Sequence, residues 1–275
     1  MSDVTLAAMF AVFIWWFSTG IVLLLNRLSR GAVSLSLLLS SLLGISALVG
    51  LAHTAQQSSV AAAYCAFTCA LLVWGWHELS FLTGWVTGPR KTALPQGLGE
   101  GQRFIQAVRA ILWHEIGILV VGVFIAWLTW GAPNQVGSGT FFVLWAMRTS
   151  AKLNLYFGVR NLSEQFLPAH LSYMQSFFRR RAGNWLLPFV LAGAGFVLAL
   201  MVNQVLQPDT STATVVGITL VATMLALAIV EHLLLVLPFD TTALWRWALR
   251  EAGKHRPAQP PQVTEQAVFL PSESR

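Results

Sequence analysis

Residues 212–238 read TATVVGITLVATMLALAIVEHLLLVLP, and no charged residue lies between Asp209 and Glu231. An apolar run of about 20 residues is long enough to cross the hydrocarbon core of a bilayer as a helix. Three further gaps without Asp, Glu, Lys or Arg run from Arg30 to Glu78, from Glu115 to Arg148 and from Arg181 to Asp209. The chain is therefore predicted to cross a membrane several times.

The composition supports this class. Hydrophobic residues make up 56% of the chain and charged residues only 10%, with a mean hydropathy of +0.65, whereas soluble domains carry roughly 25% charged residues. We predict an all-α fold, a polytopic integral membrane helix bundle. The net charge of +6 is attributed to basic anchors at the inner membrane face and not to a nucleic-acid-binding patch.

About seven transmembrane helices are expected, near residues 5–25, 33–52, 60–86, 104–130, 139–157, 185–206 and 213–238. Arginine and lysine occur in every second connection, as in loops that stay on the cytoplasmic side. These residues are Arg27 and Arg30; Arg90, Lys91 and Arg103; Arg160 and Arg179 to Arg181; and Arg246, Arg250, Lys254 and Arg256. The N-terminus is thus predicted outside and the C-terminus inside.

Residues 1–250 are expected to form a single transmembrane helical domain. Within it, residues 160–181 alternate apolar and polar side chains, which is typical of an amphipathic stretch on the cytoplasmic surface. Residues 251–275 are rich in proline and polar residues, and we predict a disordered cytoplasmic tail there.

Histidine and glutamate stand side by side inside three of the predicted spans, at His77 and Glu78, His114 and Glu115, and Glu231 and His232. An ionisable group in a spanning helix is costly unless it is paired, hydrated or bound to something. At a rise of about 1.5 Å per residue, all three pairs fall between the midplane and the cytoplasmic interface. Arg148 and Lys152 belong to the same layer, so a single polar cluster is expected.

One interpretation of this cluster is a structural ion-pair network. Buried charges must be paired, and the numbers of acidic and basic groups are nearly balanced. The carboxylates would be those of Glu78, Glu115 and Glu231, and their ion-pair partners Arg148, Lys152 and Arg109.

A second interpretation is cofactor binding, because neutral imidazole ligates iron and the metals of tetrapyrroles. The candidate ligands of a bacteriochlorophyll or a haem are His77, His114 and His232. A di-iron site, with Glu78, Glu115 and Glu231 as further metal ligands, is less favoured because adjacent residues point about 100° apart on a helix. A third interpretation is a proton or ion pathway.

Several functional classes are excluded by what the chain lacks. Retinal proteins need a lysine in the last helix, whereas the lysines here are Lys91, Lys152 and Lys254. There is no phosphate-binding loop, nucleophile elbow or His-Glu-x-x-His motif. We therefore assign no catalytic residue and disfavour an enzyme.

Several long strings are distinctive: AVFIWWFSTG (11–20), FTCALLVWGWHE (67–78), GAPNQVG (131–137), SAKLNLYFGVRNLSEQFLP (150–168), EHLLLVLP (231–238) and LWRWALR (244–250). Together they resemble the PuhE family, photosynthetic complex assembly proteins of purple phototrophic bacteria. The likeness extends over about residues 5–250, which is nearly the whole chain.

The resemblance implies a multi-pass protein of the bacterial cytoplasmic membrane, inner or intracytoplasmic, in a cell that makes bacteriochlorophyll. It would support assembly of the photosynthetic reaction centre with its light-harvesting core antenna, by binding or handing over bacteriochlorophyll. The implied partners are the lipid bilayer and reaction-centre or core-antenna subunits or their assembly factors. Two alternatives stay open: an intramembrane metal-dependent oxidoreductase acting on a tetrapyrrole or another lipid-soluble substrate, and a small-molecule or proton carrier.

The topology can be tested with single cysteines introduced at Ser2 and at Gln96. The alternation of basic loops places Ser2 outside and Gln96 inside, so a membrane-impermeant thiol reagent should label only the first in intact cells. Labelling of Gln96 from outside would overturn the orientation.

Overall fold

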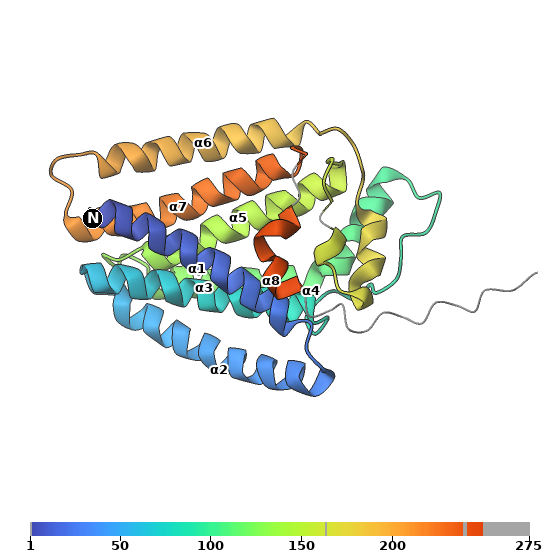
Figure 1. The fold of residues 1–275 in the computed structure, drawn as a ribbon, viewed down its shortest axis with the longest axis horizontal. Helices are drawn as coiled ribbons and strands as arrows, with labels where there is room; N and C mark the ends of the chain where they lie inside the picture. The colour runs from blue at the N-terminus through green and yellow to red at the C-terminus, as the bar shows by residue number, and fades with distance from the viewer. Residues whose placement is uncertain (1, 163, 239–240, 250–275) are drawn as a thin grey trace, which may run out of the picture.

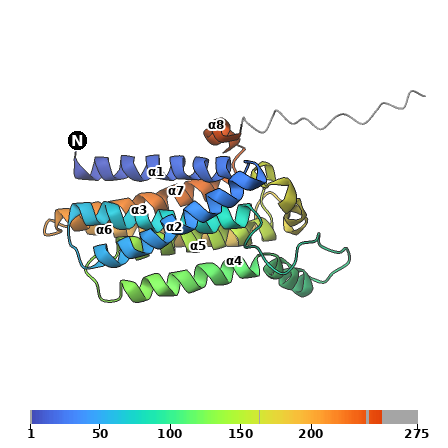
Figure 2. The ribbon, with the colours of Figure 1, turned by 90° about the horizontal axis from the view of Figure 1, so that it is seen from below.

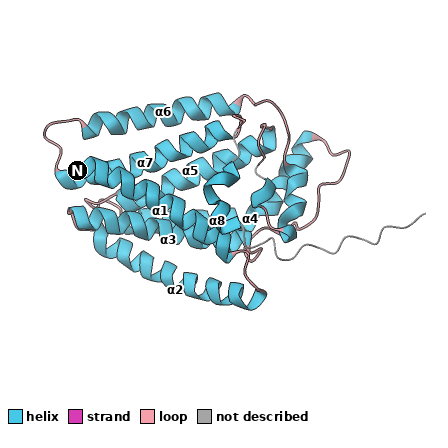
Figure 3. Cartoon of the chain, in the orientation of Figure 1, coloured by secondary structure: helices cyan, strands magenta, loops and turns pink. Residues whose placement is uncertain are grey.

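The computed structural model describes residues 2–162, 164–238 and 241–249. These residues form helices joined by turns and loops, with no β-strand among them (Figure 3). An isolated backbone bridge joins Val159 and Arg180. The all-α prediction is confirmed for this part of the chain, while the predicted tail at 251–275 lies outside the described residues.

The long helices are α1 (Asp3–Leu25), α2 (Arg30–Ala55), α3 (Val60–Leu82), α4 (Glu100–Leu128), α5 (Val136–Phe157), α6 (Leu186–Val205) and α7 (Thr212–Leu234). Each matches a predicted segment to within a few residues. The third helix ends earlier than predicted because Gly84 turns the chain with a φ of 77°, a left-handed conformation that glycine adopts readily. Three of the helices start at a serine whose side chain accepts a backbone N–H of the first turn, namely Ser2, Ser59 and Ser211.

Six of these helices are long and apolar enough to cross a membrane, which makes the chain a multi-pass membrane protein. The exception is α5, which has 22 residues but carries Arg148 and Lys152. It nevertheless lies inside the bundle beside α3 and α7 (Figure 1), and its Phe141 is fully buried.

The centre of the bundle is formed by α3 and α7. Their most apolar windows are 56% and 50% buried, against 11% for α2 and for α6. Phe67 of α3 and Leu220 and Met224 of α7 lie in one apolar cluster with residues of α1. Figure 1 shows α2 and α6 on opposite edges of the bundle, and Figure 2 shows α4 beneath it. The outer helices direct leucine, valine and phenylalanine side chains away from the protein.

The connections that carry arginine gather at one end of the bundle, on the right in Figure 1. The chain there also forms the short elements η1 (Glu164–Phe166), η2 (Ala169–Phe177), η3 (Thr241–Trp245) and α8 (Arg246–Leu249). The expected amphipathic stretch contains η1 and η2, and its Leu171, Met174 and Phe177 are buried. Leu171 and Met174 pack with Phe81 and Trp245, so these short elements close the basic end of the bundle.

Helix α4 changes direction near its first third, where its opening turns lie at an angle to the rest (Figures 1 and 2). The helix contains no proline. Instead, the preceding loop bonds to it: the His114 amide donates to the Thr87 carbonyl at 2.9 Å, and the Arg90 amide donates to the Arg109 carbonyl at 3.3 Å. Insertion of outside groups into the helical hydrogen-bond ladder is a common cause of bends.

Gly88 permits this close approach. A β-carbon added there would lie 2.1 Å from the Arg109 carbonyl oxygen, and backbone atoms cannot yield as a flexible side chain can. Gly88→Ala should therefore destabilise the fold by roughly 1–3 kcal/mol, seen as a lower thermal unfolding midpoint in detergent. The matched control is Gly75→Ala in α3, where the added methyl meets nothing within 4 Å, and equal midpoints for both variants would contradict this account.

Candidate functional site

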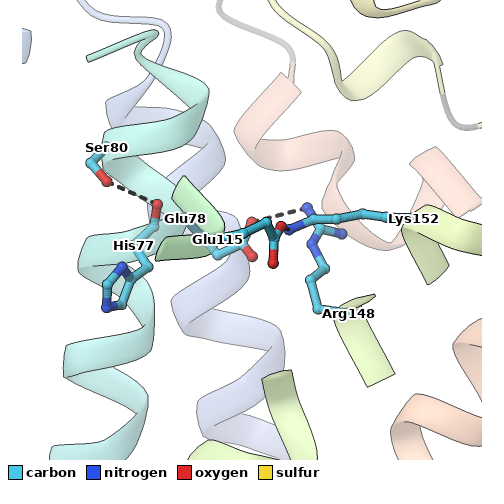
Figure 4. Close-up of polar contacts among 6 residues, drawn as sticks. All are labelled: His77, Glu78, Ser80, Glu115, Arg148 and Lys152. Atoms are coloured by element: carbon cyan, nitrogen blue, oxygen red, sulfur yellow. Dashed lines mark hydrogen bonds and ion pairs between the residues drawn. The ribbon is translucent and has the colours of Figure 1, made fainter. Parts of the chain in front are cut away.

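Two ion pairs join α3, α4 and α5 within the bundle. Arg148 donates from Nη2 to Glu78 Oε2 at 2.9 Å, and Lys152 donates from Nζ to Glu115 Oε1 at 2.6 Å. Arg148 and Lys152 are one turn apart on α5, so both face the same side of that helix. Figure 4 shows the four side chains converging, with Glu78 and Glu115 approaching from two different helices. We call these four residues the charged cluster.

The side chains of the charged cluster are only partly buried. The Glu78 side chain is 13% exposed and that of Lys152 is 19% exposed, whereas the Arg148 side chain is 43% exposed. Hydrogen-bonded opposite charges reduce the penalty for placing each ion in an apolar medium. The ion pairs therefore explain how α5, which is less apolar than its neighbours, is accommodated among them.

Glu231 and Arg109 stand apart from these ion pairs. Glu231 of α7 interacts with the Trp15 side chain of α1 and, at longer range, with Arg148. Among the described residues, neither Glu231 nor Arg109 takes part in an ion pair shorter than 4.0 Å. In the described part of the bundle, Glu78 and Glu115 therefore each have a close cationic partner, and Glu231 does not.

His77 and His114 lie side by side in the interior, with ring centroids 6.3 Å apart. They are 2% and 1% exposed. The Nε2 atom of His77 and both ring nitrogens of His114 are buried without a hydrogen-bond partner. Their neighbours are aromatic, with the Phe81 ring centroid 4.5 Å from that of His114 and Phe141 6.2 Å from that of His77.

His232 has a different environment. Its Nδ1 lies 2.8 Å from the Ala228 carbonyl and its Nε2 lies 3.0 Å from the Ser150 hydroxyl. Because a carbonyl can only accept, the proton is assigned to Nδ1, and Nε2 accepts from Ser150. Both nitrogens of His232 are thus engaged in joining α7 to α5.

The positions of the histidines and carboxylates can be compared with the needs of a metal ion and of a pigment. No group of three His, Cys, Asp or Glu side chains in the described ranges is placed to hold a metal ion. The free nitrogens of His77 and His114 have the right chemistry for an axial ligand. However, the near-complete burial of both rings leaves no open face for a macrocycle, so the helices as packed do not fit a resident tetrapyrrole.

A cavity of about 480 Å³ lies at the other end of α4 and α5, far along both helices from the charged cluster. It is lined by Trp130, Gln135, Ser138 and Phe142, among others. Gln135 bonds to the Thr129 and Ala132 carbonyls and accepts from Ser138. The polar groups of this cavity are thus largely satisfied by one another.

Two residues that contact the interior histidines, Thr87 and Ser150, were not predicted from the sequence. Thr87 bonds to the α4 backbone through its carbonyl, and Ser150 bonds to His232. The Thr-Gly-Pro string at 87–89 is the only local signal that a tight approach occurs there. No pattern in the sequence marks Ser150 as a partner of His232, because serine and threonine occur at many positions of the helices.

Comparison with known proteins gives one family and one relative. The family model described as "Protein of unknown function (DUF3623)" matches residues 1–256. A protein of Rhodobacter capsulatus described as "Uncharacterized 30.4 kDa protein in puhA 5'region" is 37% identical over 253 residues, which cover 90% of this chain and 92% of the relative. No solved structure matches.

The pairing within the charged cluster can be tested by exchange of partners. Arg148→Ala leaves the Glu78 carboxylate uncompensated, which costs about 3–5 kcal/mol in a fully buried pair and less here, because Arg148 is 43% exposed. Accumulation in the membrane should fall, and Glu78→Gln in the same chain should restore part of it. Glu115→Gln should instead rescue Lys152→Ala. Rescue of Arg148→Ala by Glu115→Gln but not by Glu78→Gln would contradict the pairing.

Proposed function

The chain belongs to the DUF3623 family, and we propose that it is a membrane accessory protein supporting assembly of the photosynthetic reaction centre and its core antenna. The observation that carries the proposal is the relative from Rhodobacter capsulatus, whose description places it in the region 5′ of puhA. We read that neighbourhood as a photosynthesis gene cluster. The resemblance of the sequence to PuhE proteins supports the same role.

We propose that the protein resides in the bacterial cytoplasmic membrane or its intracytoplasmic extensions. In this proposal α5 is a seventh span, because it has the length of its neighbours and its two cations are paired. The basic end of the bundle faces the cytoplasm, in keeping with the retention of arginine-rich loops on that side. The N-terminus then lies outside.

The site supports a role through contacts better than a role in catalysis. The charged residues are paired with one another across α3, α4 and α5, which accounts for them as parts of the fold. The outer faces of α2 and α6 present apolar side chains to lipid or to neighbouring subunits of the photosynthetic complex. The metal-dependent oxidoreductase alternative lacks a preformed set of three ligands in the described residues.

Pigment hand-over is the finer part of the proposal. Neutral imidazole can ligate the magnesium of a bacteriochlorophyll, and the ring nitrogens of His77 and His114 without a partner are the groups available for it. Because both rings are buried, α3 and α4 would first have to separate. Any pigment contact is therefore proposed to be transient.

A deletion strain of the phototrophic host distinguishes assembly from pigment synthesis. Loss of an assembly factor should lower reaction-centre and core-antenna levels severalfold, without accumulation of a particular biosynthetic intermediate. Chromatography of pigment extracts beside the wild type measures both. Build-up of one precursor would instead indicate an enzyme.

The histidines provide a second test in the same strain. If His77 and His114 contact pigment, alanine at either position should reduce complex levels while the protein itself still accumulates. His232→Ala is the matched control, because it removes two internal hydrogen bonds and should act through the amount of folded protein. Normal complex levels in the His77→Ala and His114→Ala strains would remove pigment ligation from the proposal.

A further inference from the structure

Arg160 and Arg181 are neighbours at the basic end of the bundle. The Arg181 amide donates to the Val159 carbonyl at 3.0 Å, and the Val159 amide donates to the Arg179 carbonyl at 3.1 Å. These bonds hold two short stretches of backbone side by side. Arg160 directly follows Val159, and the next residue, Asn161, donates its backbone N–H to the Leu235 carbonyl at the end of α7.

The Arg160 and Arg181 side chains are both exposed. Within the described ranges neither guanidinium forms a hydrogen bond or an ion pair. Glu100 interacts electrostatically with Arg181, but its carboxylate forms an ion pair with Arg179. Like charges on paired stretches of backbone repel each other, so an anion bound by both guanidinium groups would stabilise the arrangement.

Hydrogen bonds and close packing hold the surrounding backbone in place. Gly158 has a φ of 118°, and a β-carbon there would lie 2.8 Å from the Arg181 side chain, whose stem therefore packs over the glycine. The Asn184 side chain donates to the Gly158 carbonyl at 3.0 Å and accepts the Leu186 amide at 2.9 Å. The start of α6 is thereby tied to the end of α5.

An aromatic ledge, formed by Phe157, Trp185 and Phe189, begins one residue before Gly158, over which the Arg181 side chain packs. The ring centroids of Phe157 and Trp185 are 5.7 Å apart, and those of Trp185 and Phe189 are 6.3 Å apart. Trp185 and Phe189 are 65% and 69% exposed. Exposed tryptophan at the end of a spanning helix is typical of the headgroup level of a bilayer.

We propose that Arg160 and Arg181 bind the phosphate of an anionic phospholipid whose acyl chains lie along Trp185 and Phe189 of α6. Guanidinium groups recognise phosphate through paired N–H donors. The ledge distinguishes this ligand from a free anion, which would gain nothing from apolar rings. The inference is independent of the photosynthetic role, since it concerns only how α5 and α6 are anchored in lipid.

The test uses the full-length protein in mild detergent and native mass spectrometry to count bound lipid. The probes are phosphatidylglycerol, phosphatidylcholine and inorganic phosphate. We expect the wild type to prefer phosphatidylglycerol. The Arg160→Gln/Arg181→Gln variant should bind it roughly 25-fold more weakly, at about fivefold for each basic group near the surface. The matched control is Arg180→Gln, which removes one guanidinium at the neighbouring position. Because that guanidinium already lies 3.7 Å from Glu164, the affinity of this variant for phosphatidylglycerol should change less than twofold.

Equal retention of phosphatidylglycerol by the wild type and both variants would overturn the proposal. Binding of inorganic phosphate without a preference for phosphatidylglycerol would overturn it in favour of a free-anion site. Should the double variant not fold, a phosphatidylglycerol with a photoreactive acyl chain decides with the wild type. Crosslinks should then map to the peptide containing Trp185 and Phe189, and crosslinks confined to other helices would contradict the site.

Discussion

The pairing of Arg148 with Glu78 and of Lys152 with Glu115 is the constraint on which this bundle depends. Without these contacts α5 could not lie among apolar helices, because an uncompensated charge in lipid costs several kcal/mol. Since the two bonds reach to α3 and α4, they also fix the rotation of α5 about its axis. That rotation in turn places Phe141 in the core and Ser150 against His232.

The bend in α4 is linked to the same region. The loop that follows α3 bonds to the α4 backbone through Thr87 and Arg90, and His114 at the bend comes to lie against His77. Glu115 is the next residue, and it reaches Lys152. The ion pair, the bend and the histidine pair thus arise from one packing arrangement among α3, α4 and α5. In this arrangement His77 and His114 are buried, whereas the charged cluster is partly exposed.

Much of the fold could be predicted because apolar runs and helix ends are local properties. The seven helices were expected near their observed bounds, and the caps at Ser2, Ser59 and Ser211 show why several start where they do. The proximity of Glu78 and Glu115 to Arg148 and Lys152 followed from counting residues along helices of known rise, whereas Glu231 and Arg109 lie outside these ion pairs. The identity of each partner did not follow from that count, because it depends on the rotation of whole helices. His77 has a ring nitrogen without a hydrogen-bond partner, whereas His232 is hydrogen-bonded to Ser150. This difference could not be predicted, because no local sequence pattern identifies Ser150 as a partner.

The role proposed for the protein is to act through contacts within a photosynthetic assembly. Affinity purification of the tagged full-length chain from native membranes in mild detergent, with an absorption spectrum and metal analysis of the eluate, tests it most directly. The account predicts that reaction-centre or core-antenna subunits are recovered with it, and that washing removes them together with any pigment. Recovery of the chain alone, with stoichiometric metal or tightly bound tetrapyrrole after washing, would contradict it.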